Sequence, residues 1–241
     1  MASRSRAPAL AQWYAANGRH ELAWRATRDR WALLVAEVML HQTQVARVEQ
    51  MWPAFMAKFP DPETTARAGA GAVIAAWERL GYPRRARWLW EAAVRVHEHG
   101  WPDDLTELPG VGPYTAAAVG NFAFGREVLP VDTNVRRVQE RSGGSFDHEC
   151  AQALFDLGAT VCLARVPRCG VCPLVEVCPS RGRRYEPLRK QSPFAGSFRE
   201  RRAKALRAVA AGLAPDDDEA VASLARDGLV VLTAAGAALP S

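Results

Sequence analysis

The chain has 241 residues, of which 49% are hydrophobic and 24% charged, and this composition is typical of a folded globular protein. Its formal net charge of +5 is compatible with a nucleic-acid partner, although a high arginine content alone gives the same balance. No stretch approaches the roughly 20 apolar residues of a membrane span, and the N-terminal MASRSRAPAL lacks the apolar run of a signal peptide, so we expect a cytoplasmic protein.

Helical periodicity dominates the chain, and strand signals are scarce. Residues 31–52 carry apolar side chains at nearly helical spacing, with Asp29 as the N-cap, and Pro53 ends or kinks that run. The same pattern predicts helices from residue 61 and over 72–79, 84–99, 103–107, 114–124, 134–141, 148–162 and 199–211, and a last one that begins at 216–218 and ends at Gly228. We expect a strand at 229–233 and a turn at 234–236.

Short helices joined by short turns indicate an all-α fold. The clearest boundary lies within residues 180–202, a basic stretch that is punctuated by proline and poor in apolar residues. The segment that follows it is interpreted as two helices and a short hairpin. This order predicts either a small winged-helix-like appendage at the C-terminus or an ordinary packing element.

Four of the five cysteines form one cluster, Cys162, Cys169, Cys172 and Cys178, at spacing C-x6-C-x2-C-x5-C. Disulfides are disfavoured in the cytoplasm, so the cluster indicates a metal centre. Four thiolates can hold either zinc or an iron–sulfur centre, and the long x6 and x5 intervals depart from paired zinc knuckles. We therefore favour iron–sulfur over zinc. Cys150 lies outside the spacing, and we interpret it as a buried thiol.

The segment LPGVGPYTAAAV (108–119) contains a glycine-rich turn before a helix. Gly110 and Gly112 allow positive φ and leave backbone N–H groups uncovered, and Pro113 suits the first helical position. A turn of this kind offers convergent donors to one phosphate of a nucleic acid, and the helix points its positive end at the same place. The alternative is a tight corner between two helices without a ligand.

Two carboxylates have unusual settings. Glu37 lies inside the apolar stretch VAEVML, and an apolar environment favours a carboxylic acid that can give up its proton; the alternative is a Glu37 that faces solvent. Asp132, in VDTNVRR, stands just before a predicted helix, so it is either a simple N-cap or a carboxylate that stabilises a cationic sugar. The polar residues 41–44 suit hydrogen bonds to base edges.

Several segments together carry a resemblance to a known family. In chain order they are AWRATRD (23–29), AEVMLHQTQV (36–45), LGYPRRARWL (80–89), LPGVGPYTA (108–116), VDTNVRR (131–137) and QALFDLGATVC (152–162). Over roughly residues 12–180 the chain resembles the helix–hairpin–helix base-excision DNA glycosylases (the HhH-GPD superfamily), and most closely their adenine-specific MutY branch. The short C-terminal tail looks like that of actinobacterial members.

The resemblance implies a fold and a domain organisation. A six-helix domain with the helix–hairpin–helix would span residues 29–132, an iron–sulfur cluster domain would combine 1–28 and 133–186, and a small appendage would follow at 187–241. Double-stranded DNA with a mispaired or damaged base would be the partner of a monomeric enzyme that excises adenine opposite 8-oxoguanine or guanine. A [4Fe–4S] cluster would be held by Cys162, Cys169, Cys172 and Cys178.

The resemblance also implies roles for single residues. Glu37 would protonate the adenine N7, Asp132 would stabilise the oxocarbenium-like sugar, and Tyr114 would stand where bifunctional relatives carry a Schiff-base lysine, which predicts a monofunctional glycosylase. Gln42 and Tyr82 would wedge into the base stack. The substrate-binding residues would be Trp24, Arg25, Gln42, Thr43, Tyr82, Asn134 and Gln152, and the DNA-backbone contacts Gly110, Gly112 and Thr115.

The chain departs from the family pattern at His41, where many members have Gln, and at Pro83, where many have a second Tyr. The tail is too short for the usual domain that recognises 8-oxoguanine. Two alternatives therefore stay open: a mismatch thymine or uracil DNA glycosylase, which also carries Tyr at the position of Tyr114, and a non-catalytic protein that binds DNA lesions.

Overall fold

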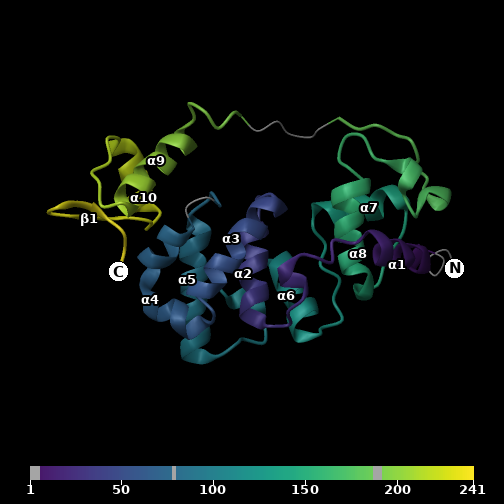
Figure 1. Ribbon diagram of the computed structural model, residues 1–241, viewed down its shortest axis with the longest axis horizontal. Coiled ribbons are helices and arrows are strands. Elements are labelled where there is room, and N and C mark those ends of the chain that lie inside the picture. The colour runs from purple at the N-terminus through teal and green to yellow at the C-terminus, as the bar shows by residue number, and fades with distance from the viewer. Residues whose placement is uncertain (1–5, 78–79, 187–191) are drawn as a thin grey trace. The chain divides into compact units, whose positions relative to one another are not determined.

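The computed structural model describes residues 6–77, 80–186 and 192–241, shown in Figure 1. Over these ranges the chain is mostly helical, which confirms the predicted helical class, and no helix there is long and apolar enough to cross a bilayer. The chain forms two compact units. One combines residues 1–28 with 113–190, and the other combines 29–112 with 191–241.

The unit of residues 29–112 and 191–241 is built around one buried helix. Every residue of α2 (Arg30–Leu40) from Trp31 to Met39 is buried, as expected for a helix that is apolar on all sides. Asp29 caps it as predicted, since its Oδ1 accepts a hydrogen bond from the Ala32 N–H at 2.7 Å. The other elements here are α3 (Val45–Lys58), α4 (Pro62–Ala76), α5 (Arg84–His99) and η2 (Leu105–Glu107).

One helix prediction for this unit was wrong and another was confirmed. The run 31–52 is two helices, because α2 ends at Leu40 and α3 begins at Val45; the residue between them that breaks the helix is Gln42, with φ of 55°. Pro53 lies inside α3 and does not end it. The two helices predicted from residue 61 and over 72–79 correspond to the two parts of α4, which non-helical backbone at Gly69 (φ 80°) separates; residues 78 and 79 lie outside the described residues.

The C-terminal segment contains α9 (Phe198–Ala210), α10 (Asp218–Arg226) and an antiparallel hairpin of β1 (Val231–Thr233) and β2 (Gly236–Ala238), which lie together in Figure 1. This is the predicted order of elements, and its winged-helix character stays a prediction. Asp227 anchors the segment to α5, because its carboxylate pairs with Arg84 and its backbone carbonyl accepts from Arg87 at 3.0 Å. The Gly71 N–H donates to the Pro240 carbonyl at 2.9 Å.

The second unit packs its helices around one apolar core. Its elements are α1 (Arg6–Asn17), η1 (Ala23–Arg25), α6 (Pro113–Phe124), α7 (Thr133–Ser142), η3 (His148–Cys150), α8 (Ala151–Asp156), the π-turn η4 (Leu157–Val161), η5 (Cys169–Val171) and η6 (Val175–Val177). Leu10, Val135, Leu154 and Leu174 are buried in that core. The compact units divide at Gly112, so α6 lies in the unit that also contains the four clustered cysteines. The domain bounds expected from the sequence, with a division at residue 132, stay a prediction.

Candidate active site

Glu37 is a buried acid on α2. Its exposed fraction is 6%, and it is the one charged side chain in the buried run from Trp31 to Met39. The structure therefore excludes the alternative in which Glu37 faces solvent. A buried carboxyl group among apolar side chains is a candidate general acid, and this role of Glu37 stays a prediction.

Two exposed turns follow α2 and precede α5. Gln42 in the first turn and Tyr82 in the second are the two non-glycine residues with positive φ, 55° and 48°, in the described part of the chain. Left-handed backbone costs a non-glycine residue roughly 1–2 kcal/mol, so other contacts must hold both turns. One such contact is direct, because the Thr43 Oγ1 lies 3.2 Å from the Leu80 carbonyl.

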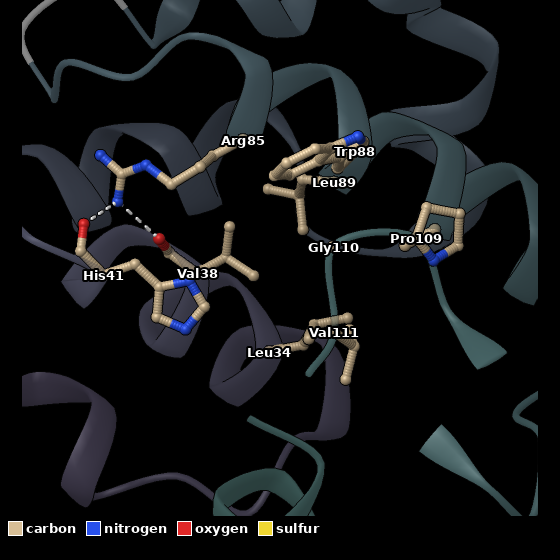
Figure 2. A pocket seen from close by; sticks show the side chains of 10 residues that line it. Leu34, Val38, His41, Arg85, Trp88, Leu89, Pro109, Gly110 and Val111 are labelled. Atoms are coloured by element: carbon tan, nitrogen blue, oxygen red, sulfur yellow. Dashed lines mark hydrogen bonds between the residues drawn. The ribbon is translucent and has the colours of Figure 1, made fainter. Parts of the chain in front are cut away.

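The main contact between these turns is the guanidinium of Arg85, which sequence reasoning missed. Its Nη1 donates to the carbonyls of Val38 at 2.8 Å and His41 at 2.5 Å, as Figure 2 shows. Its Nη2 donates to Leu80, Gly81 and Thr43 Oγ1 at 2.9–3.0 Å. Burial lowers the pKa of Arg85 to about 10. Little in the sequence indicated this role for Arg85, because its partners are mostly backbone carbonyls, which every residue carries, rather than acidic side chains.

Arg85 also borders a small apolar hollow in the same unit (Figure 2). The hollow is lined by Leu34, Val38, His41, Arg85, Trp88, Leu89, Ala92, Pro109, Gly110 and Val111. Burial, followed by the charge of Arg85, lowers the pKa of His41, so this imidazole is neutral at pH 7. The hollow has room for only a water-sized group and is too small for a nucleobase.

The glycine-rich turn has the conformation that its sequence predicts at Gly110. Gly110 has φ of 75°, and a Cβ there would lie 2.8 Å from the Trp88 Cβ, so only glycine fits. A Cβ at Gly112 would meet nothing within 4 Å, which leaves the backbone open to a ligand. Thr115, on α6, is buried, and its predicted contact with the DNA backbone stays a prediction.

Asp132 is the N-cap of α7 in the other unit. Its Oδ1 accepts from the Val135 N–H at 2.6 Å, and its Oδ2 accepts from the Asn134 Nδ2 at 2.8 Å. Asn134 is held in turn by Arg137, whose Nη2 donates to the Asn134 Oδ1 at 2.7 Å and whose Nε donates to the Cys162 carbonyl at 2.8 Å. The capping interpretation is therefore correct, and the cap also fixes the orientation of the carboxylate.

A buried ion-pair cluster surrounds Arg25, a predicted substrate-binding residue. Asp156 is fully buried; it accepts two hydrogen bonds from Arg25, at 2.7 and 2.8 Å, and also pairs with Arg19. Burial alone would raise the pKa of Asp156, but the hydrogen bonds from Arg25 and Arg19 outweigh it and lower the pKa. Sequence reasoning missed Asp156, although a lone acid in the apolar run ALFDLGATV gave the same signal as Glu37.

Three further predicted residues lie in the same unit as this cluster. Trp24 is buried in η1, and Gln152 is half-buried on α8. Tyr114 on α6 packs its ring edge-on against Phe155, with ring centroids 6.3 Å apart. The helix α8 contributes both Gln152 and Asp156 to this unit.

The four clustered cysteines are half-buried in one loop that begins after η4. Burial and the neighbouring thiols of Cys162, Cys178 and Cys169 raise the pKa of Cys172 to about 11, so these three cysteines lie within electrostatic range of Cys172. Among the residues that the structure describes, however, no three His, Cys, Asp or Glu side chains stand close enough together to hold a metal ion.

Donors already surround these sulfurs. The Gly182 N–H donates to the Cys169 Sγ at 3.3 Å, and the Arg141 guanidinium lies 3.8 Å from the Cys162 Sγ. Arg141 also donates to the carbonyls of Leu163 and Ala164 at 2.7 Å and stacks on the Tyr185 ring. N–H donors thus approach two of the four sulfurs, those of Cys162 and Cys169, and donors of this kind suit the charge of an iron–sulfur centre.

The predicted site residues thus fall into two groups. Glu37, Gln42, Thr43, Tyr82, Gly110 and Gly112 belong to the unit of 29–112 and 191–241, whereas Trp24, Arg25, Tyr114, Thr115, Asp132, Asn134, Gln152 and the four cysteines belong to the other. That Glu37 and Asp132 face one nucleotide stays a prediction.

Comparisons with known proteins point to one family. Residues 35–155 match the HhH-GPD superfamily of base excision DNA repair proteins. The chain is 39% identical to the adenine DNA glycosylase of Mycobacterium tuberculosis, over 94% of this chain and 90% of the relative. Among solved structures it is similar to a thermostable thymine-DNA glycosylase (TM-score 0.65, 25% identity, 72% of this chain and 93% of that one). It is also similar to an endonuclease III trapped as a covalent intermediate with DNA (TM-score 0.62, 24% identity, 74% and 96%).

Proposed function

Because the chain belongs to the HhH-GPD superfamily of base-excision DNA repair proteins, we propose that it is an adenine DNA glycosylase, which removes adenine mispaired with guanine or 8-oxoguanine. The mycobacterial relative that bears this name supports the choice of base. The structural observation that carries the proposal is the buried acid Glu37, because an adenine anion leaves a sugar only when an acid protonates it.

The reaction needs a base that has left the duplex, since its glycosidic bond is inaccessible inside the stack. Glu37 then gives its proton to the adenine N7, and the electrons of the N-glycosidic bond leave with the base. Water adds to the anomeric carbon, and its proton returns to the Glu37 carboxylate. The products are free adenine and an abasic site.

Asp132 stabilises the cationic sugar in this scheme. Breaking the bond before water adds gives the sugar oxocarbenium character, and a fixed carboxylate lowers the energy of that state. The hydrogen bonds from the Val135 N–H and from Asn134 support this role, because they hold the carboxylate in one orientation.

Tyr114 makes the enzyme monofunctional. A lysine amine can form a Schiff base with the opened sugar and cleave the strand, whereas a phenol cannot. The edge-on packing of Tyr114 against Phe155 supports a positioning role for its ring. We expect no efficient trapping of a covalent enzyme–DNA adduct by borohydride.

The four clustered cysteines hold a [4Fe–4S] cluster as a structural cofactor. The donor set fits this group, because four thiols occupy one loop with N–H donors at the Cys162 and Cys169 sulfurs. When bound, the cluster supplies rigidity to a loop that also carries Arg165, Arg168 and Arg181. Those arginines bind DNA phosphates.

A second candidate function is thymine excision, because a thymine-DNA glycosylase is among the similar solved structures. Duplexes with A, T or U opposite G, and with A opposite 8-oxoguanine, separate the two functions when strand cleavage by alkali is measured after incubation. Adenine release supports the proposal, and release of T or U alone would contradict it. Binding without release of any base would instead indicate a lesion-binding protein.

A further inference from the structure

Two exposed residues of this protein hold a backbone conformation that their residue types rarely adopt. Gln42 and Tyr82 both have positive φ, 55° and 48°, and neither is a glycine. Tyr82 also exposes 42% of its surface, although a tyrosine ring gains energy by burial. Conformations of this kind persist only where the surrounding structure fixes them, and they concentrate at functional sites.

The side chain of Arg85 fixes the backbone at both Gln42 and Tyr82. Arg85 donates to the His41 carbonyl at 2.5 Å, directly before Gln42, and to the Gly81 carbonyl at 2.9 Å, directly before Tyr82. Its Nη2 also donates to the Thr43 Oγ1 at 3.0 Å, directly after Gln42. Its own backbone N–H donates to the Tyr82 carbonyl at 3.0 Å. The two turns are therefore tied to a single guanidinium.

The setting of Arg85 is unusual for a charged residue. It is 5% exposed and forms no ion pair with a carboxylate among the residues described here. Backbone carbonyls hold it instead, including those of Val38 and Met39 at the end of α2, where the helix dipole favours a cation. A buried charge that is held by backbone carbonyls and by one hydroxyl, that of Thr43, has a position that depends on the shape of the surrounding backbone.

We propose that Arg85 is the positioning residue that sets Gln42 and Tyr82 as a pre-formed wedge for extruding the target base from the duplex. This inference rests on the proposed function, because a base must leave the stack before its bond can be cut. Proteins unstack bases by inserting side chains between them, and the insertion is efficient only if the side chains are already oriented. The α2 carbonyls that bind Arg85 come from the same helix that carries Glu37, so the wedge is also tied to the proposed acid.

The test variant is Arg85→Lys, which keeps the charge and loses the planar fork. The matched control is Arg95→Lys on the same helix, where the side chain is 43% exposed and pairs with Glu107. Extrusion is read directly by placing the fluorescent adenine analogue 2-aminopurine opposite guanine, with Glu37→Gln present to stop the chemistry. Its fluorescence rises when the base unstacks.

We expect Arg95→Lys to match the parent protein. Arg85→Lys should remove most of the fluorescence rise at saturating protein while it changes the dissociation constant for the duplex by less than threefold. In the active background, single-turnover adenine release should fall at least tenfold. If Arg85→Lys does not fold, Thr43→Val, which removes one acceptor and keeps the shape, should reduce the fluorescence rise in the same direction but by less.

A double-mutant cycle separates positioning from general stability. If Arg85 acts through the wedge, Arg85→Lys should cost little further rate in a Tyr82→Ala background, because the side chain that it positions is already gone. An undiminished effect in that background, or a full fluorescence rise with Arg85→Lys, would overturn the inference. Failure of the proposed function is a different result: the parent protein would then unstack 2-aminopurine but release no adenine from any duplex.

Discussion

The Arg137 guanidinium donates a hydrogen bond to Asn134 at 2.7 Å, and Asn134 donates in turn to the Asp132 carboxylate. The same guanidinium donates to the Cys162 and Gly158 carbonyls at 2.8 Å. An arginine on α7 therefore connects the carboxylate of the candidate site to the first cysteine of the cluster. No position in the sequence displays this link, because its members act through backbone carbonyls and an amide.

Arg137→Gln should slow adenine release without unfolding the protein. The variant loses the bonds that hold Asn134, so the Asp132 carboxylate loses one of its two fixed partners. We expect a fall of about tenfold in single-turnover rate, which corresponds to about 1.4 kcal/mol of barrier. Arg136→Gln is the control, because Arg136 is the exposed neighbour on the same helix. Equal rates in the two variants would show that the link has no effect on chemistry.

Asp156→Asn should destabilise the protein strongly. The change leaves Arg25 and Arg19 without their buried anion, and breaking a buried ion pair from one side costs about 3–5 kcal/mol. Denaturant unfolding at pH 7 measures the loss. Asp147→Asn provides the comparison, because Asp147 is exposed and caps nothing with its side chain. A loss below about 1 kcal/mol for Asp156→Asn would mean that solvent reaches this cluster.

Asp156 should also make the stability of the folded protein depend on pH. The folded-state pKa of Asp156 lies below its ordinary value, so folding favours the ionised form. Its contribution to stability is therefore complete above the unfolded pKa of about 3.9 and is lost as the pH falls through the folded value. Melting temperatures between pH 3 and 7 should fall more steeply at the acid end for the parent than for Asp156→Asn.

Sequence patterns located the acids better than they located the arginines. Glu37 was recognisable because it is the one charged residue in the apolar segment VAEVML, where packing alone would favour an apolar side chain. The structure buries it. Asp156 sits in an equally apolar run and was open to the same reasoning. Arg85 could not be identified in this way, because LGYPRRARWL contains several arginines. Only the fold determines which of them donates hydrogen bonds to the carbonyls of α2.

The helix boundaries are a second feature that sequence patterns predicted only in part. The period of apolar residues over 31–52 continues through the turn at 41–44, so periodicity alone predicted one helix. The helix ends there, and side chains bind its last carbonyls. Arg85 donates to the carbonyls of Val38, Met39 and His41, and the Thr43 Oγ1 also donates to the His41 carbonyl. Conversely, Asp29 was correct as an N-cap because capping needs only local sequence.

Glu37→Gln should abolish turnover and retain DNA binding. The amide cannot give a proton to the base, and loss of a general acid costs about 100- to 10,000-fold in rate. Stability should not fall, because the change removes a buried group that can ionise. Single-turnover adenine release and duplex binding by fluorescence anisotropy measure the two effects, with Glu49→Gln on the exposed face of α3 as control. Retained release would rule out Glu37 as the acid.

Gly110→Ala should be costly and Gly112→Ala should not. A methyl group at Gly110 meets the Trp88 Cβ at 2.8 Å and also requires positive φ, whereas one at Gly112 meets nothing within 4 Å. We expect Gly110→Ala to lower the free energy of unfolding by at least about 1–2 kcal/mol. Thermal melting of both variants checks the difference. A similar melting temperature for the two would show that the turn can rearrange.

Iron content tests the proposed cofactor independently of activity. Protein purified without oxygen should be yellow-brown and contain about four irons per chain, as four thiolate ligands imply. Cys172→Ser should lose most of that iron, because serine replaces one of the four thiols. Cys150→Ser should keep it, because Cys150 lies before η4 and outside the cluster spacing.

Loss of the cluster should also loosen the loop that Arg141 holds through Leu163 and Ala164, so proteolysis should cut the Cys172→Ser protein first between residues 162 and 186. Colourless parent protein that binds zinc would contradict the assignment, and equal iron loss in both variants would mean that the metal is not held by this cysteine set.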